Sequence, residues 1–181
     1  MFYIRALELN DYKVTHRWRL HPGTWDSVVG PKRYVSEETE RKWVEQSIAL
    51  HEKGEVLRFS ICEEKTDKML GMIGVTNIDN HSKSFATSSM IDPESRGQGI
   101  IGKGRELVFR YMFDEMGMER VCARVLIDNM QNRKSLKKFG YVEEGVMRQA
   151  AFKNGVYKDL VIYSMLKEEF YELYGNPKGV S

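Results

Sequence analysis

The chain has 181 residues, of which 41% are hydrophobic and 30% are charged, and its formal net charge is +2. This length and apolar content predict one domain over residues 1–181 with a substantial core. The small net charge argues against direct nucleic-acid binding, and no run of about 18 apolar residues is present to span a membrane.

A strand and two helices are predicted at the start of the chain. Apolar and polar residues alternate over residues 2–7, which predicts a strand, and a helix is predicted over residues 11–20. Residues 24–35 show no regular period and contain aromatic side chains, so we expect a packed wall or a binding site there. Ser36 is the expected N-cap of the second helix, which Gly54 ends.

Three antiparallel strands are predicted next, because the hydrophobic period changes to two. They cover residues 56–61, 69–78 and 84–91, with short polar turns between them. A glycine-rich segment follows the third strand. Behind it a helix is predicted over residues 105–116, with Gly117 as its end.

The last part of the chain predicts one parallel strand, one helix and a hairpin. The strand over residues 120–127 is expected to run parallel to the strand before the preceding helix. A short helix is predicted over residues 130–139. A terminal helical turn is predicted over residues 167–174, with a frayed end over about residues 172–181. Two final strands, over residues 141–146 and 157–166, are joined around Asn154-Gly155, a strong hairpin sequence.

The glycine-rich segment is the main functional feature of the sequence. It contains four glycines within residues 97–104, in a predicted strand-to-helix turn. Free backbone N–H groups and the helix dipole make such a turn a site for phosphate. Four glycines are more than a simple turn requires, so we expect a phosphate-bearing ligand. A surface turn without a ligand is the alternative.

Two nucleotide-binding motifs match this segment incompletely. Residues 97–102 spell the dinucleotide fingerprint G-x-G-x-x-G, but the strands before them are antiparallel and no acidic residue follows at the required place. Residues 97–103 begin like a P-loop, but Gly104 stands where a Ser or Thr must hold magnesium. A nucleotide-binding domain therefore remains only as an alternative hypothesis.

The segment resembles the acetyl-CoA loop of the GCN5-related N-acetyltransferases (GNAT), written Q/R-x-x-G-x-G/A. Arg96 and Gly99 match this pattern, whereas Ile101 stands where the family has Gly or Ala, one residue before Gly102. In the family the loop amides hold the CoA pyrophosphate. The resemblance therefore implies that the Ile101 side chain points away from the phosphate and into the core.

A second motif resembles the same family. Asn129 and Gly140-Tyr141 fit its signature, N-x-x-S/A followed by seven residues and G-F, with Asn132 in place of Ser or Ala. In the family this Asn binds the pantetheine arm beside a splayed strand, an arrangement similar to strand addition. Residues 144–149 and 154–159 resemble the branch that includes ribosomal-protein alanine N-acetyltransferases and spermidine N-acetyltransferases.

This resemblance implies an α/β fold, with a mixed, mostly antiparallel sheet of about seven strands, flanked by about four helices and splayed at the acetyl-CoA site. The implied activity is acetyl transfer from acetyl-CoA to a primary amine, without a metal. A cationic cluster over residues 133–138 is expected to attract the 3′-phosphate of CoA, unless it is a solvated helix face. The expected cofactor-binding residues are Met90, Ile91, Arg96, Gly97, Gln98, Gly99, Ile100, Ile101, Gly102, Asn129, Lys134 and Lys137.

The usual proton-transfer residues of the family are missing. Ala86 stands in place of a Glu on the strand before the loop, and Leu136 in place of a Tyr after the motif Asn. Because an alkyl ammonium must lose a proton before it attacks, a base is needed. Glu144 matches a Glu considered catalytic in the alanine-acetylating branch and is the candidate base, or else a carboxylate that holds a turn. Ser135 is the candidate donor to the thiolate, or else an ordinary helix residue.

The acceptor and the compartment follow from weaker features. Residues 25–35 contain one acid, Asp26, against Lys32 and Arg33, which argues against a polyamine dication as the acceptor. We predict a protein or peptide N-terminal amine, with a small amine such as a polyamine or amino sugar, or a CoA-binding module without catalysis, as alternatives. The two cysteines, Cys62 and Cys122, are expected to be buried free thiols in a cytoplasmic protein without a signal peptide. The sequence is compatible with a homodimer but does not define one.

Overall fold

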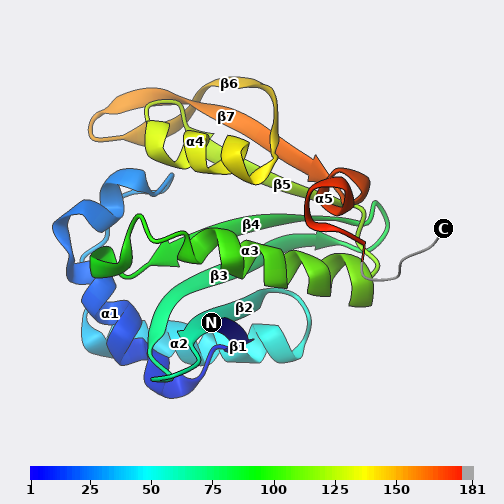
Figure 1. Cartoon of the computed structure of the whole chain (residues 1–181). Coiled ribbons are helices and arrows are strands. Elements are labelled where there is room, and N and C mark those ends of the chain that lie inside the picture. The colour runs from blue at the N-terminus through cyan, green and yellow to red at the C-terminus, as the bar shows by residue number, and fades with distance from the viewer. Residues whose placement is uncertain (177–181) are drawn as a thin grey trace.

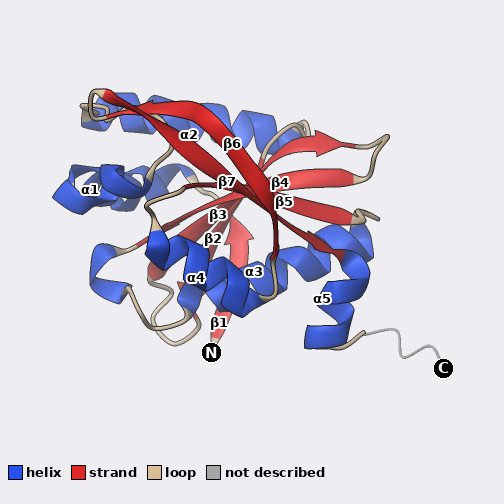
Figure 2. Cartoon of the chain, turned by 90° about the horizontal axis from the view of Figure 1, so that it is seen from above, coloured by secondary structure: helices blue, strands red, loops and turns tan. Residues whose placement is uncertain are grey.

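A central sheet with helices on both faces organises residues 1–176, the part of the chain that the computed structural model describes (Figures 1 and 2). The sheet has seven strands in the order β1-β2-β3-β4-β5-β7-β6. Neighbouring strands pair antiparallel, except for the parallel pair β4 and β5, so the predicted mixed sheet is confirmed. The strands are β1 (Phe2–Ala6), β2 (Leu57–Glu63), β3 (Met69–Asp79), β4 (Ser84–Ile91), β5 (Arg120–Leu126), β6 (Val142–Lys153) and β7 (Val156–Leu166).

The helices divide between the two faces of the sheet. One core contains buried residues of α3, α4 and α5 together with strands β2, β3, β4, β5 and β7, and a separate core joins α1 and α2 to the other face. The sequence predicts about four helices and a terminal helical turn, and the structure has a fifth helix, α5, at the place of that turn. They are α1 (Tyr12–Leu20), α2 (Glu37–Glu52), α3 (Ile100–Arg110), α4 (Met130–Phe139) and α5 (Lys167–Tyr174), and a π-helical turn (Tyr111–Glu115) extends α3.

Aromatic packing explains why α5 is helical to its end. Phe170 is fully buried, and the Tyr174 ring stacks on Phe139 with ring centroids 4.8 Å apart. The Tyr174 hydroxyl also donates to the Phe139 carbonyl oxygen at 3.0 Å. The predicted terminal helical turn over residues 167–174 is therefore confirmed and is held by tertiary contacts, whereas the prediction that fraying begins at about residue 172 is wrong for residues 172–174. The remaining part of that prediction, residues 177–181, lies outside the described residues.

The last hairpin is longer than its sequence suggests. Asn154 and Gly155 both have positive φ, 52° and 80°, as the predicted two-residue turn requires. However, β6 continues to Lys153 instead of ending near residue 146. Its register shifts between Met147 and Ala151, where Gln149 has a φ of 51°. This bulge interrupts the alternation of apolar residues, which is why the second half of the strand is not visible in the sequence.

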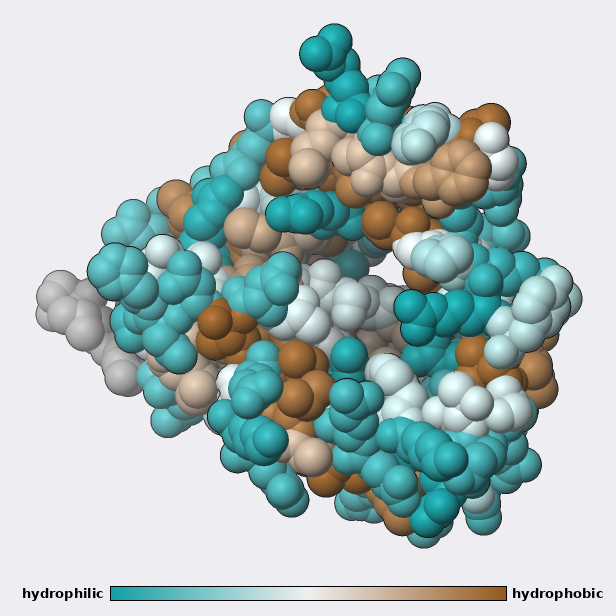
Figure 3. Space-filling view, turned by 180° about the vertical axis from the view of Figure 1, so that it is seen from behind, coloured by the Kyte–Doolittle hydropathy of each residue, from teal (hydrophilic) through white to brown (hydrophobic). Residues whose placement is uncertain are grey.

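The sheet splits between β4 and β5. The two strands pair at three positions, of which Ala86 with Cys122 is the last, although β4 continues to Ile91 and β5 to Leu126. We call the gap between residues 87–91 of β4 and 123–126 of β5 the strand opening. Seen from behind, the surface has a hole below the part formed by β6 and β7 (Figure 3). The predicted splay of the sheet is therefore confirmed.

Candidate active site

The glycine loop lies at the end of β4 and leads directly into α3. A single turn of 3-10 helix (Pro93–Ser95) follows the strand, and α3 begins at Ile100. Gly97 and Gly99 have φ values of 81° and 75°, in the left-handed region that favours glycine. A Cβ on either residue would meet no atom within 4 Å, so their outer side is open. The first N–H groups of α3 are thus presented at an accessible helix start.

The four glycines have two different roles. A Cβ on Gly104 would lie 2.2 Å from Cδ1 of Ile61, so this glycine lets α3 pack closely on the sheet. Gly102 has an ordinary helical conformation and open space around its Cα, so neither the backbone nor protein packing requires a glycine there. The first turn of α3 contains no acidic residue. A diphosphate therefore fits against Gly102 and its neighbours, where the helix dipole favours an anion.

Ile101 turns its side chain away from this open side. Its side chain packs against the main core. If Gly71 of β3 carried a Cβ, that atom would lie only 3.3 Å from Cδ1 of Ile101. The prediction that the Ile101 side chain points into the core is confirmed, whereas its contact with the cofactor stays a prediction. The departure from the family pattern is therefore compatible with a ligand at the loop, because glycine in β3 makes room for the larger side chain.

Asn129 is the N-cap of α4. Its Oδ1 accepts a hydrogen bond from the Asn132 N–H at 3.1 Å, and its Nδ2 donates to the Ser27 carbonyl oxygen at 3.5 Å. Both ends of the side-chain amide thus contact the protein. The capping bond is shown by the structure, whereas the expected contact with pantetheine stays a prediction.

We expect Asn129→Ala to lower the free energy of unfolding by about 1 kcal/mol, the usual effect of losing a cap. Urea unfolding measures this loss, and Asn129→Asp is the control because it keeps the accepting oxygen. If the amide also binds pantetheine, calorimetry will show acetyl-CoA affinity weaker by about 1–2 kcal/mol in Asn129→Ala. Unchanged stability in that variant would contradict the capping role.

The cationic cluster on α4 is partly neutralised by Glu143, which the sequence analysis did not single out. Lys137 Nζ lies 2.9 Å from Oε2 of Glu143, and Arg133 lies 3.5 Å from the same oxygen. Lys137 leads the groups that hold the pKa of the Glu143 carboxyl below its usual range. Within residues 1–176, Lys134 and Lys138 make no ion pair. Of the two lysines expected to bind phosphate, Lys134 is the one without a competing carboxylate.

Ser135 contacts a buried cation. Its Oγ accepts a hydrogen bond from Nη1 of Arg105 on α3 at 3.2 Å, and Arg105 is only 4% exposed. Burial lowers the pKa of Arg105 from its usual value. Nearby, the buried Tyr141 hydroxyl lies 3.3 Å from Oγ1 of Thr87, the first β4 residue beyond the last pair with β5. The sequence patterns gave no indication that the polar groups of Arg105 and Tyr141 are buried in this core.

Glu144 occupies a bulge in β6 on the opposite face of the sheet. The register of β6 and β7 shifts between Glu143 and Gly145, which leaves Glu144 as the extra residue. Its Oε2 lies 2.5 Å from Nη2 of Arg120 at the start of β5. Arg120, and then a hydrogen bond with Ser164, hold the pKa of Glu144 below its usual value. Cross-strand pairing puts Ser164 opposite Cys122, the half-buried free thiol where the strands part.

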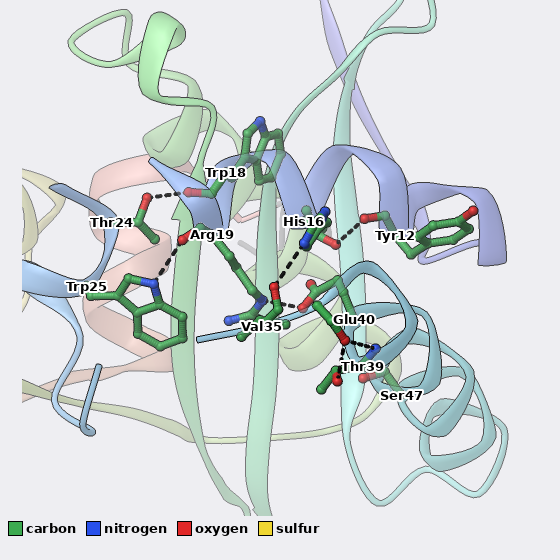
Figure 4. Close-up of polar contacts among 12 residues, drawn as sticks. Tyr12, His16, Trp18, Arg19, Thr24, Trp25, Val35, Thr39, Glu40 and Ser47 are labelled. Atoms are coloured by element: carbon green, nitrogen blue, oxygen red, sulfur yellow. Dashed lines mark hydrogen bonds and ion pairs between the residues drawn. The ribbon is translucent and has the colours of Figure 1, made fainter. Parts of the chain in front are cut away.

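Residues 24–35 close one side of the strand opening. Trp25 is buried and its Nε1 donates to the Arg19 carbonyl oxygen at 2.9 Å, while Oγ1 of Thr24 donates to the Trp18 carbonyl oxygen (Figure 4). Lys153, only 3% exposed, donates from β6 to the carbonyl oxygens of Trp25 and Gly30 at 2.5 and 2.9 Å. Residues 24–30 thus form a packed wall, tied to β6 on the far side of the opening, whereas residues 31–34 are exposed.

A split sheet with a glycine-rich helix start beside it is the architecture expected of a GNAT acetyltransferase. Residues 2–142 match the acetyltransferase (GNAT) domain family. The chain therefore belongs to this family, whose fold binds acetyl-CoA, and it is an N-acetyltransferase.

Relatives of the chain agree on the family and differ in their acceptors. The ribosomal-protein-serine acetyltransferase of Escherichia coli is 27% identical over 165 residues, 90% of this chain and 91% of the relative. An uncharacterised prophage-derived N-acetyltransferase of Bacillus subtilis is 30% identical over 130 residues, 72% and 71% of the two chains. The fold is similar to spermidine N-acetyltransferase from Vibrio cholerae in complex with CoA and spermine, with a TM-score of 0.83 and 20% identity over 93% and 97% of the chains.

The described part of the chain gives no indication of a metal centre or a membrane span. Residues 1–176 hold no group of three or more His, Cys, Asp or Glu placed to bind a metal ion. Among the same residues, every helix is too short or too polar to cross a bilayer.

Proposed function

We propose that the chain acetylates the α-amine of a protein or peptide N-terminus, with the acceptor and the cofactor meeting at the strand opening from opposite faces. The glycine loop and α3 lie on one face, so the cofactor enters there. The face covered by α1 and α2 is left for the acceptor. One observation carries this proposal: Lys153 of β6 donates to the carbonyl oxygens of Trp25 and Gly30, which holds residues 24–30 as a wall beside the opening.

The cofactor contacts proposed here follow from the helix start and from the unpaired strand edges. The amides of residues 97–102, with Arg96, hold the pyrophosphate, and Lys134 and Lys137 lie toward the 3′-phosphate. The free edge of β4, which includes Met90 and Ile91, offers backbone groups to the pantetheine amides. Acetyl-CoA supplies the activated acetyl thioester.

Proton transfer is proposed for the two candidates that the sequence offers. Glu144 accepts the proton that the acceptor nitrogen sheds as the neutral amine attacks the thioester, because Glu144 lies on the acceptor face beside the row of Cys122 and Ser164. Ser135 stands on the cofactor face, where its hydroxyl, oriented by Arg105, donates toward the departing thiolate. Ala86 and Leu136, which stand where the family has Glu and Tyr, cannot themselves transfer a proton.

A panel of acceptors with radiolabelled acetyl-CoA tests the proposal. We expect turnover of N-terminal peptides to exceed turnover of spermidine and of amino sugars, because the acceptor wall has few acids to hold a dication. Faster turnover of spermidine than of every peptide would contradict the peptide acceptor. Acetyl-CoA binding without turnover of any amine would instead indicate a CoA-binding module.

A further inference from the structure

Arg58 crosses the sheet toward the strand opening on the acceptor face. Its cross-strand partner on β3 is Gly74, whose partner on β4 is Ser88. A Cβ on Gly74 would lie 2.4 Å from Nη1 of Arg58 and 2.9 Å from Oγ of Ser88. Gly74 is therefore needed for the guanidinium to pass over β3. Because Ser88 lies beyond Ala86, the last β4 residue paired with β5, the guanidinium ends at the edge of the opening.

The position of Arg58 is fixed, yet its charge is not neutralised. Its Nε donates to Oγ of Ser47 at 3.2 Å, and its Cζ lies 4.8 Å from the centroid of the Trp43 ring. The Cζ of Arg19 lies 4.6 Å from the centroid of the same ring. The Nε of Arg19 forms an ion pair with Oε2 of the buried Glu40 at 2.6 Å (Figure 4). Glu40 thus pairs with Arg19 and not with Arg58. In the described part of the chain, Arg58 makes no ion pair, and its terminal nitrogens donate to no protein group.

This arrangement favours an anion from outside the protein. Arg58 lies against the Trp43 ring and beside Arg19, so loss of solvation and then the charge of Arg19 lower its pKa and disfavour its charged form at some cost. A carboxylate would offset that cost, because its two oxygens match the fork of a guanidinium. On the other side of the opening Arg124 lies on the same face and also has no ion pair within residues 1–176. The edge of the opening is therefore cationic on both sides.

We propose that Arg58 binds a carboxylate of the acceptor, so that the preferred substrates are peptides with an acidic residue shortly after the N-terminal amine. This inference rests on the proposed peptide acceptor. From the guanidinium over Gly74 of β3 to the middle of the opening is one to two strand spacings, about 5–10 Å, and an extended chain advances about 3.3 Å per residue. The acidic residue is therefore placed at position two, three or four of the peptide. A polyamine would bring a second positive charge to the same cationic edge.

Matched peptides test this directly on the full chain. Each pair has the same length and differs only by Glu or Gln at position two, three or four. We expect kcat/KM of the wild type to favour Glu by at least about tenfold at one position, the effect of a charge-assisted hydrogen bond. In Arg58→Gln this ratio should fall to about one. Arg41→Gln is the control, because Arg41 is an exposed residue of α2 that pairs with Glu45, and it should keep the ratio.

Each outcome decides the inference. Equal rates for Glu and Gln peptides with the wild type would overturn it and leave the peptide acceptor standing. A preference that persists in folded Arg58→Gln would also overturn it. If Arg58→Gln does not fold, Arg58→Lys replaces it, because lysine keeps the charge but lacks the guanidinium fork. Arg58→Lys is expected to lower the Glu-to-Gln ratio of kcat/KM several-fold. An unchanged ratio in that variant would contradict the role of Arg58. Faster turnover of spermidine than of all peptides would remove both the inference and the peptide acceptor.

Discussion

Gly99→Val should abolish measurable acetyl-CoA binding while leaving the protein folded. Gly99 has a φ of 75° at the N-cap of α3, and a Cβ there meets no protein atom. A branched side chain would project into the open space where the proposed pyrophosphate lies, and it would also disfavour the left-handed conformation that aims the loop amides. Titration calorimetry with acetyl-CoA measures the effect.

The same substitution at a second glycine distinguishes the effect of backbone strain from the loss of ligand binding. Gly117 also has a positive φ, 64°, and open space around its Cα, but it lies at the other end of the helix. Gly117→Val should therefore cost about the same stability, on the order of 1–3 kcal/mol, and keep the affinity for acetyl-CoA. Equal affinities of folded Gly99→Val and wild type would show that the cofactor does not approach this loop.

The sequence predicts the sheet well because its strands are bounded by turns with strong local chemistry. Asn154-Gly155 and the glycine loop both take the positive φ values that their composition favours. Where prediction failed, a local irregularity decides the structure. The second half of β6 is hidden by its bulge at Gln149. The predicted terminal helical turn is present, and Tyr174 at its end stacks on Phe139 from a distant part of the chain.

The polar groups around the site are less visible in the sequence than the loop. Arg58, Arg105 and Lys153 look like ordinary surface charges in their strands and helix. Only the fold shows that Arg105 and Lys153 are buried and that Arg58 crosses over a glycine of the next strand. A glycine inside a strand is the one local indication of such a crossing, because it marks close approach of another group.

Glu144→Gln should lower kcat/KM by about 10²–10⁴ at neutral pH, the range for loss of a general base. The ion pair with Arg120 gives this prediction a definite pH dependence. Because the pKa of Glu144 is held below its usual value of 4.5, its carboxylate is ionised throughout the neutral range and loses its charge only as the pH falls through that lowered value. Between about pH 6 and 9 the rate should therefore rise with deprotonation of the acceptor α-amine, whose usual pKa is about 7.7–8.0.

The same ion pair offers the matched control for a purely structural role. If Glu144 only anchors β6 to β5, Arg120→Gln breaks the same 2.5 Å contact and should lower kcat/KM as much as Glu144→Gln does. If Glu144 is the base, Arg120→Gln leaves a carboxylate that is still ionised at neutral pH, so it should retain most of the activity that Glu144→Gln loses. In Glu144→Gln the rise with amine deprotonation should persist at a lower rate. A loss smaller than about threefold would mean that water or another residue accepts the proton.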